Sequence, residues 1–208
     1  MKNRTQYFFI SGTSGKLECV LDLPKNAPLG IVLIAHPHPL YGGAMDNKVV
    51  QTLARTFAGL GYASVRMNFR GVGKSEGSHD NGYGEADDMA LLLEHMKNKY
   101  PNLPVVLAGY SFGTYVLMLL QKRLATKNEI VERMVLVAAT AGKWAVDSIS
   151  VNSILIHGEH DELIPLNDVL NWVRPQDIPV IVIPGGDHFF NHKLHHLKNI
   201  IHALYSRS

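Results

Sequence analysis

Six short apolar segments, separated by stretches with helical periodicity, most strongly limit the folds open to this chain. Because their apolar character is continuous rather than alternating, they fit strands that are covered on both faces. Strands that alternate with helical patterns predict a parallel sheet with crossover helices. The segments are GIVLIAHP, YASVRMNF, PVVLAGY, RMVLVAA, SILIHG and PVIVIPG, at residues 30–37, 62–69, 104–110, 133–139, 153–158 and 179–185.

An antiparallel hairpin is predicted ahead of these runs, where QYFFISG and KLECVLDLP are separated by Thr13, Ser14 and Gly15. Apolar residues recur at helical spacing over residues 49–57, 89–100 and 194–205. The expected architecture is a mostly parallel, twisted α/β sheet with an antiparallel N-terminal hairpin and helices on both faces. The length of 208 residues fits a single domain, 1–208, and no linker or repeat divides it.

Composition excludes several classes of protein. A chain that is 46% hydrophobic and 18% charged can form a globular core without disulfides or a structural metal. Its 20 basic and 18 acidic residues are scattered, so no nucleic-acid partner is expected. No segment has the length of a membrane span, and the first residues lack the apolar core of a signal peptide. With Cys19 as the single cysteine, a cytoplasmic protein is expected, and the sequence does not indicate its oligomeric state.

One motif carries reactive chemistry. The segment 109–113, Gly-Tyr-Ser-Phe-Gly, lies between the run PVVLAGY and the helical stretch TYVLMLLQKRL, which is the setting of a G-x-S-x-G nucleophile turn. Such a turn strains the backbone and exposes the serine hydroxyl, here that of Ser111. The amide of Phe112 then lies at a helix N-terminus, where it can donate to an anion.

A nucleophilic serine needs a base, and the base needs an acid that fixes its tautomer. His188 follows the last apolar run and is the expected base. Asp161 follows the preceding run, and Glu159 and Glu162 lie beside it. Asp187 adjoins His188, but neighbours in sequence usually point apart. Asp161 is therefore favoured as the acid, with the two glutamates as alternatives.

These segments together resemble the α/β-hydrolase superfamily, in particular its small, lidless, dienelactone-hydrolase-like members. The resemblance covers essentially the whole chain and includes residues 36–43 and 68–75. It implies that Ser111, Asp161 and His188 form a catalytic triad in the chain order of that family. It also implies a second oxyanion donor after GIVLIA. Because Pro37 and Pro39 have no amide hydrogen, that donor is expected to be the backbone of His38.

The resemblance implies a serine hydrolase that cleaves carboxylic esters or thioesters of a small acyl substrate. Residues 140–152 have room only for a loop or a short helix, so we expect an open site without a cap domain. Tyr41, Trp144 and Phe189 are expected to line its pocket, although packing roles are as consistent with the sequence. A peptidase or amidase of the same fold, and a non-catalytic binding module, are the alternatives.

Three other patterns favour structural roles. Gly73, Lys74 and Ser75 resemble the end of a phosphate-binding loop, but position 68 lacks the required glycine, so a turn is expected. His188, His192 and His196 recur every four residues without the glutamate of H-E-x-x-H, so neither a metal nor another cofactor is expected. The imidazoles of residues 36 and 38 are expected to fix their loop by hydrogen bonds.

Overall fold

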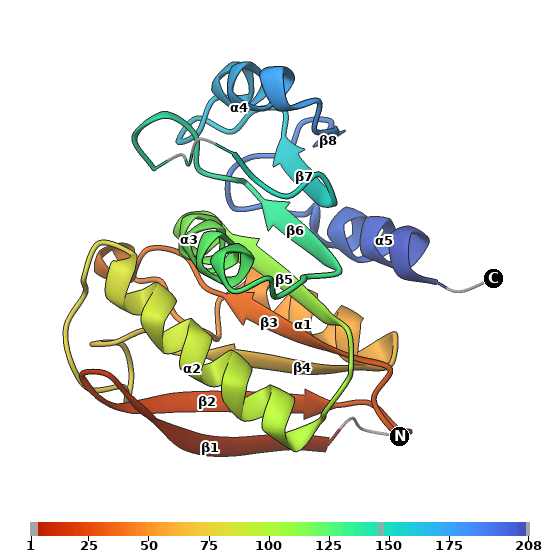
Figure 1. Ribbon diagram of the computed structural model, residues 1–208. Helices are drawn as coiled ribbons and strands as arrows, with labels where there is room; N and C mark the ends of the chain where they lie inside the picture. Colours follow the sequence, from red (N-terminus) through yellow and green to blue (C-terminus); the bar gives the residue numbers. More distant parts are fainter. Residues whose placement is uncertain (1–3, 145, 147, 207–208) are drawn as a thin grey trace.

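Eight strands form one sheet in the order β1-β2-β4-β3-β5-β6-β7-β8 in the computed structural model, which describes residues 4–144, 146 and 148–206 (Figure 1). Residues 1–3, 145, 147 and 207–208 of the expected domain lie outside this description. The strands are β1 (Arg4–Gly12), β2 (Gly15–Leu23), β3 (Gly30–Ala35), β4 (Tyr62–Met67), β5 (Val105–Tyr110), β6 (Arg133–Val137), β7 (Ser153–Gly158) and β8 (Val180–Ile183).

The first two strands form the expected antiparallel hairpin, and β2 joins it antiparallel to β4. All other neighbouring strands are parallel. The α/β-hydrolase architecture predicted from the sequence is thereby confirmed. The prediction of strands covered on both faces is wrong for β8, because it is an edge strand whose first three residues are only partly buried or exposed.

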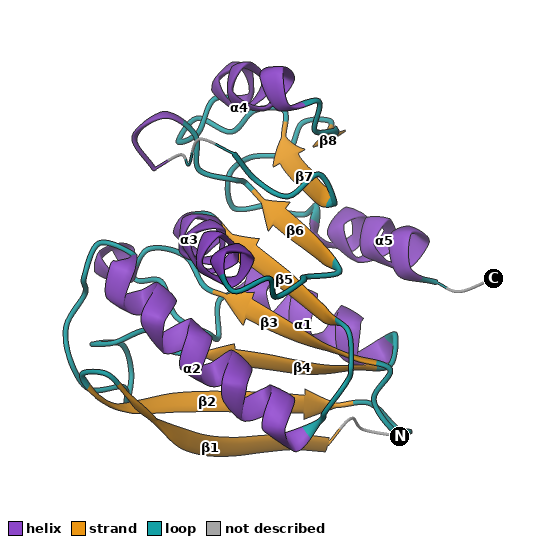
Figure 2. Ribbon diagram, viewed as in Figure 1, coloured by secondary structure: helices purple, strands orange, loops and turns teal. Residues whose placement is uncertain are grey.

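Helices cover both faces of the sheet (Figure 2). Helices α1 (Lys48–Gly59) and α5 (Leu194–Tyr205) pack on one face, around Val50, Phe57 and Leu197. Helices α2 (Tyr83–Lys99), α3 (Phe112–Thr126) and α4 (Leu166–Val173) pack on the other, around Met89 and Val116. The short helix α4 is not among the helices predicted from the sequence. Burying apolar side chains on both faces stabilises the sheet and fixes where its strands end.

Local signals explain where the elements begin. The side chain of Asn47 caps α1 by accepting a hydrogen bond from the amide of Val49 at 2.9 Å. Between β6 and β7 the described residues form one short 3-10 helix, Gly142–Trp144, and no other helix or strand. This agrees with the expected absence of a cap domain. Among the described residues, none of the helices has the length and apolar character needed to cross a membrane.

Candidate active site

Ser111 occupies a strained turn between β5 and α3. Its φ of 53° and ψ of −127° lie in a region that residues with a side chain rarely adopt. The flanking glycines are required by close packing. A Cβ atom on Gly109 would lie 2.9 Å from the carbonyl carbon of Gly113, and one on Gly113 would lie 2.4 Å from the carbonyl oxygen of Ala35. The turn therefore holds the hydroxyl at the carboxyl end of the sheet.

The structure brings Ser111, His188 and Asp161 together. Nε2 of His188 lies 3.1 Å from Oγ of Ser111, and Nδ1 of the same ring lies 2.7 Å from Oδ2 of Asp161. The other carboxylate oxygen accepts hydrogen bonds from the amides of Leu163 and Ile164 at 3.0 and 2.8 Å. Because an ionised carboxylate only accepts, the His188 hydrogen is on Nδ1 and Nε2 is left to accept from the serine.

The other acidic candidates have different partners. Asp187 accepts from the amide and the side chain of Asn191 at 2.9 and 2.6 Å. Desolvation works to raise the pKa of Asp187, but these bonds and the charge of Lys48 outweigh it and lower the pKa. Glu159 accepts from the amide of Gly185, and the side chain at position 162 is exposed. Of the four acids, only Asp161 contacts the imidazole of residue 188.

The two expected oxyanion donors lie on adjacent segments. Phe112 is the first residue of α3, where amides have no carbonyl partner within the helix. His38 lies in the loop after β3, and its carbonyl oxygen accepts from the amides of Tyr41 and Gly43 at 3.1 and 3.0 Å. The rings of His38 and Phe112 are 4.5 Å apart between centroids. Their packing links the loop after β3 to the start of α3.

The buried side chain of His36 fixes the loop after β3 by two hydrogen bonds. Nδ1 donates to the carbonyl of Pro37 at 2.6 Å, and Nε2 accepts from the amide of Phe69 at 2.9 Å. Burial lowers the pKa of His36 to about 3, so the ring is neutral at ordinary pH. Nδ1 of His38 likewise accepts from the amide of Leu40 at 3.2 Å. The expectation that both imidazoles hold the loop by hydrogen bonds is confirmed.

A cavity of about 500 Å³ opens beside Ser111 and His188. Tyr41, Trp144 and Phe189, the three expected pocket residues, all line it. Tyr41 is 87% exposed and Phe189 50% exposed, so these rings form an open rim. No Asp, Glu, Lys or Arg occurs among the described residues that line the cavity. The space beside the hydroxyl therefore fits an uncharged, partly aromatic or aliphatic group.

Sequence reasoning missed two residues that hold the triad segments in place. The buried hydroxyl of Tyr110 donates to the carbonyl of His188 at 3.0 Å, and burial raises its pKa. Nε2 of His157 donates to the carbonyl of Ile164 at 2.8 Å and lies 3.5 Å from Oδ2 of Asp161. Burial lowers the pKa of His157. A histidine inside the otherwise apolar run SILIHG is the signal that could have identified it.

Residues 73–75, His192 and His196, which were assigned structural roles, are not among the residues that line the cavity. The Ser75 hydroxyl donates to the carbonyl of Asn68 and accepts from the amide of Glu18, so its turn is tied to β2. His192 precedes α5 and has a φ of 59°, so the four-residue spacing with His196 does not define one helix face. The described residues contain no group of three potential metal-ligating side chains. Cys19 is buried in the core, where burial raises its pKa to about 12.

Comparisons with known proteins show the family and agree with the fold. The family model described as serine aminopeptidase, S33 matches residues 26–146. An uncharacterised protein of Rickettsia prowazekii (strain Madrid E), RP471, is 32% identical over 198 residues, 89% of this chain and 82% of that protein.

Two solved structures are similar over nearly their whole length. XC6422 from Xanthomonas campestris, described as an α/β serine hydrolase without a lid, is 30% identical with a TM-score of 0.90, over 98% of this chain and 94% of that one. An α/β serine hydrolase homologue from Coxiella burnetii is 35% identical with a TM-score of 0.85, over 97% of this chain and 96% of that one.

Proposed function

Because the chain belongs to the α/β-hydrolase superfamily, in the family described as serine aminopeptidase, S33, we propose that it is a serine hydrolase that cleaves carboxylic esters or thioesters. One observation carries the proposal, namely the continuous line of contacts from the Ser111 hydroxyl through the His188 ring to the Asp161 carboxylate. This arrangement is suited to making an alcohol nucleophilic.

In the proposed reaction, Oγ of Ser111 attacks the acyl carbonyl carbon while its proton moves to Nε2 of His188. Asp161 holds the ring in the required tautomer and stabilises the imidazolium. The tetrahedral intermediate collapses as the C–O or C–S bond breaks, and the leaving group takes the proton from Nε2. Water then loses a proton to the same nitrogen and attacks the acyl-enzyme, which releases the acid and restores the Ser111 hydroxyl.

The negative charge that develops on the carbonyl oxygen needs donors that are already in place. We assign this role to the backbone amides of Phe112 and His38. Preorganised donors of this kind are worth a factor of about 10² to 10³ in turnover each. The assignment is supported by the hydrogen bond from Nδ1 of His36 to the carbonyl of Pro37, because this carbonyl shares a peptide plane with the His38 amide. The position of Phe112 at the start of α3 restricts its amide in the same way.

An aminopeptidase is the second candidate, since the matching family model carries that description. Such an enzyme must hold the positive amino terminus of its substrate, which a carboxylate in the cavity would do best. The described residues that line the cavity supply none. This favours a neutral ester or thioester over a peptide.

A fluorophosphonate probe followed by a substrate panel tests the proposal. We expect wild-type protein to be labelled at residue 111 and Ser111→Ala to remain unlabelled. Nitrophenyl esters of increasing acyl length should then be hydrolysed with a kcat/KM well above that of aminoacyl nitroanilides. The reverse order would establish the aminopeptidase. Absence of labelling in folded wild-type protein would identify a non-catalytic binding module instead.

A further inference from the structure

The ring of His79 packs against both residues whose amides we assign as oxyanion donors. Its centroid lies 4.8 Å from that of His38 and 5.5 Å from that of Phe112. His79 belongs to the loop between β4 and α2, and its side chain is only 11% exposed. The imidazole therefore contacts two segments that are far apart in the chain, the loop after β3 and the start of α3.

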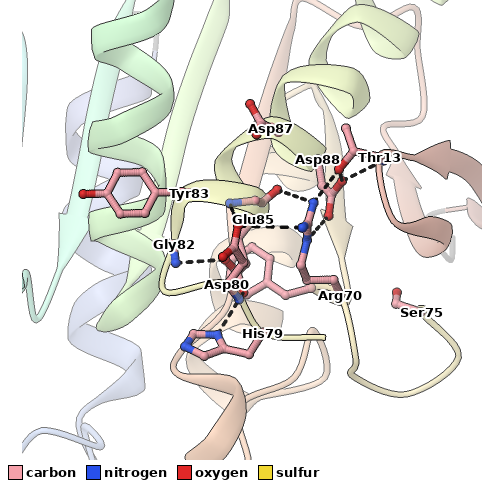
Figure 3. A network of polar contacts seen from close by, with 12 residues as sticks. Thr13, Arg70, Ser75, His79, Asp80, Gly82, Tyr83, Glu85, Asp87 and Asp88 are labelled. Atoms are coloured by element: carbon pink, nitrogen blue, oxygen red, sulfur yellow. Dashed lines mark hydrogen bonds and ion pairs between the residues drawn. The ribbon is translucent and has the colours of Figure 1, made fainter. Parts of the chain in front are cut away.

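A buried carboxylate fixes the position of this ring (Figure 3). Glu85, in the first turn of α2, is fully buried and lies 2.8 Å from Nδ1 of His79. It also accepts from the amides of Asp80 and Gly82 at 2.9 and 2.8 Å. Because the carboxylate only accepts, Nδ1 of His79 is the donor in this bond. One hydrogen bond thus sets the orientation of the ring.

The helix that carries Glu85 is itself braced (Figure 3). Nε of Arg70 lies 2.8 Å from Oδ2 of Asp88, and another nitrogen of the same guanidinium donates to Oγ1 of Thr13 at 2.6 Å and to the carbonyl of Gly84 at 2.8 Å. Asp88 is fully buried and also accepts from the amide of Thr13 at 3.2 Å. The start of α2 is tied in this way to the β1–β2 turn and to the loop after β4.

We propose that His79, held by Glu85, is a positioning residue that keeps the His38 and Phe112 amides in register for the oxyanion. The inference rests on the proposed function. To cap the N-terminus of α2, Glu85 needs only its bonds to the loop amides. Its third bond, to Nδ1 of His79, instead orients the imidazole against the rings of His38 and Phe112. Since catalytic geometry tolerates displacements of only about 0.5 Å, a support behind the donors affects turnover more than substrate binding.

Two substitutions of His79 and one matched control test the role. His79→Ala removes the ring, and His79→Phe keeps a ring but loses the donor to Glu85. The control His95→Ala also removes a histidine ring that stacks on an aromatic one, that of Phe8, at 5.3 Å on another part of α2. All proteins are compared by kcat and KM for one nitrophenyl ester and by the affinity for phenylboronic acid, which mimics the tetrahedral intermediate.

We expect kcat of His79→Ala to fall about tenfold, a fraction of the loss of a whole donor, with KM changed less than twofold and boronate affinity reduced as much as kcat. The phenylalanine variant should lie between alanine and wild type, and His95→Ala should match wild type. A kcat and boronate affinity within twofold of wild type in His79→Ala would overturn the inference. So would equal losses in both His79 variants, because the ring packing would then have no effect.

Amide NMR spectra separate this inference from the proposed function. In His79→Ala the backbone amide resonances of His38 and Phe112 should shift and exchange with solvent faster, while His95→Ala leaves both unchanged. This result supports the positioning role even if wild-type protein hydrolyses no ester, in which case the proposed function alone fails. Unchanged amides in folded His79→Ala would reject the positioning role regardless of activity.

Discussion

Oδ2 of Asp161 lies 2.7 Å from Nδ1 of His188, although the two residues are 27 positions apart in the chain. The sheet order explains the contact, because β7 and β8 are parallel neighbours and both residues follow the carboxyl ends of these strands. Asp187, directly beside the histidine in sequence, is bonded to Asn191 instead. Strand order, rather than sequence proximity, therefore determines which carboxylate contacts the imidazole of His188.

Substitution of the two aspartates should give very different results. Asp161→Asn is expected to lower kcat for a nitrophenyl ester by about 10³ to 10⁴, because the amide can no longer hold the imidazole in the required tautomer. Asp187→Asn, the matched control, should stay within threefold of wild type. Steady-state kinetics of both variants at one pH measure the difference. If Asp187→Asn is the more damaging of the two, the acid has been assigned to the wrong residue.

The His38 amide can be removed without changing the local backbone direction. His38 has a φ of −58°, which proline also adopts. His38→Ala loses the ring but keeps the amide hydrogen, and His38→Pro loses both. We expect kcat of the proline variant to be a further 10² to 10³ lower, roughly the value of one oxyanion donor. Equal kcat values for the two variants would exclude the His38 amide as a donor.

Tyr110→Phe removes the hydroxyl that donates to the carbonyl of His188 at 3.0 Å. Because this carbonyl would be left buried without that donor, the free energy of unfolding should fall by about 1 to 3 kcal/mol. We expect kcat to fall less than tenfold, since the triad side chains are retained. Urea denaturation of Tyr110→Phe is compared with that of Tyr7→Phe, whose ring is 77% exposed and whose stability should match wild type.

Acid should destabilise the fold through His36. Its pKa is about 3 in the folded protein against an ordinary value of 6.5, so the unfolded chain takes up the proton first as pH falls. The stability that His36 contributes is complete above pH 6.5 and is lost progressively down to about pH 3, with a slope of at most about 1.4 kcal/mol per pH unit. Urea midpoints measured across this range should vary less steeply in His36→Asn. An unchanged slope would mean that residue 36 does not titrate as its burial requires.

The open rim predicts a dependence on acyl length. Phe189 lines the cavity and is 50% exposed, so Phe189→Ala should raise KM for a long-chain or aromatic nitrophenyl ester about threefold to tenfold, through lost apolar contact. KM for nitrophenyl acetate should change less than twofold, because the acetyl group is too short to reach the rim. A uniform increase across the acyl series would indicate a distorted site instead of a lost contact.

The sheet and the strained turn at Ser111 could be predicted because their signals are local. Each parallel strand is a continuous apolar run, and Gly109 and Gly113 flank the serine where the backbone must pack closely. The antiparallel hairpin likewise follows from two short runs joined by a turn. Helix α4 was missed because its eight residues span little more than two turns and begin after Pro165 without a side-chain cap.

The supports of the site could not be predicted, because they depend on contacts between distant segments. Nothing local links His79 to His38, 41 positions earlier, or Tyr110 to the carbonyl of residue 188. Glu85 lies in the first turn of α2, and its hydrogen bond to His79 forms only when the loop after β4 is in place. Residue types indicate the candidate reacting groups, whereas tertiary packing determines which side chains hold them in place.

The backbone angles at Ser111 lower the stability of the fold but expose the serine hydroxyl. A glycine there would relieve the steric conflict of φ 53° and lower the energy of the native fold, yet it would leave the molecule without its proposed nucleophile. Random mutagenesis screened for heat resistance alone should therefore recover inactive glycine variants at this codon. A serine held in a conformation that it disfavours is what a trade of stability for reactivity predicts at this position.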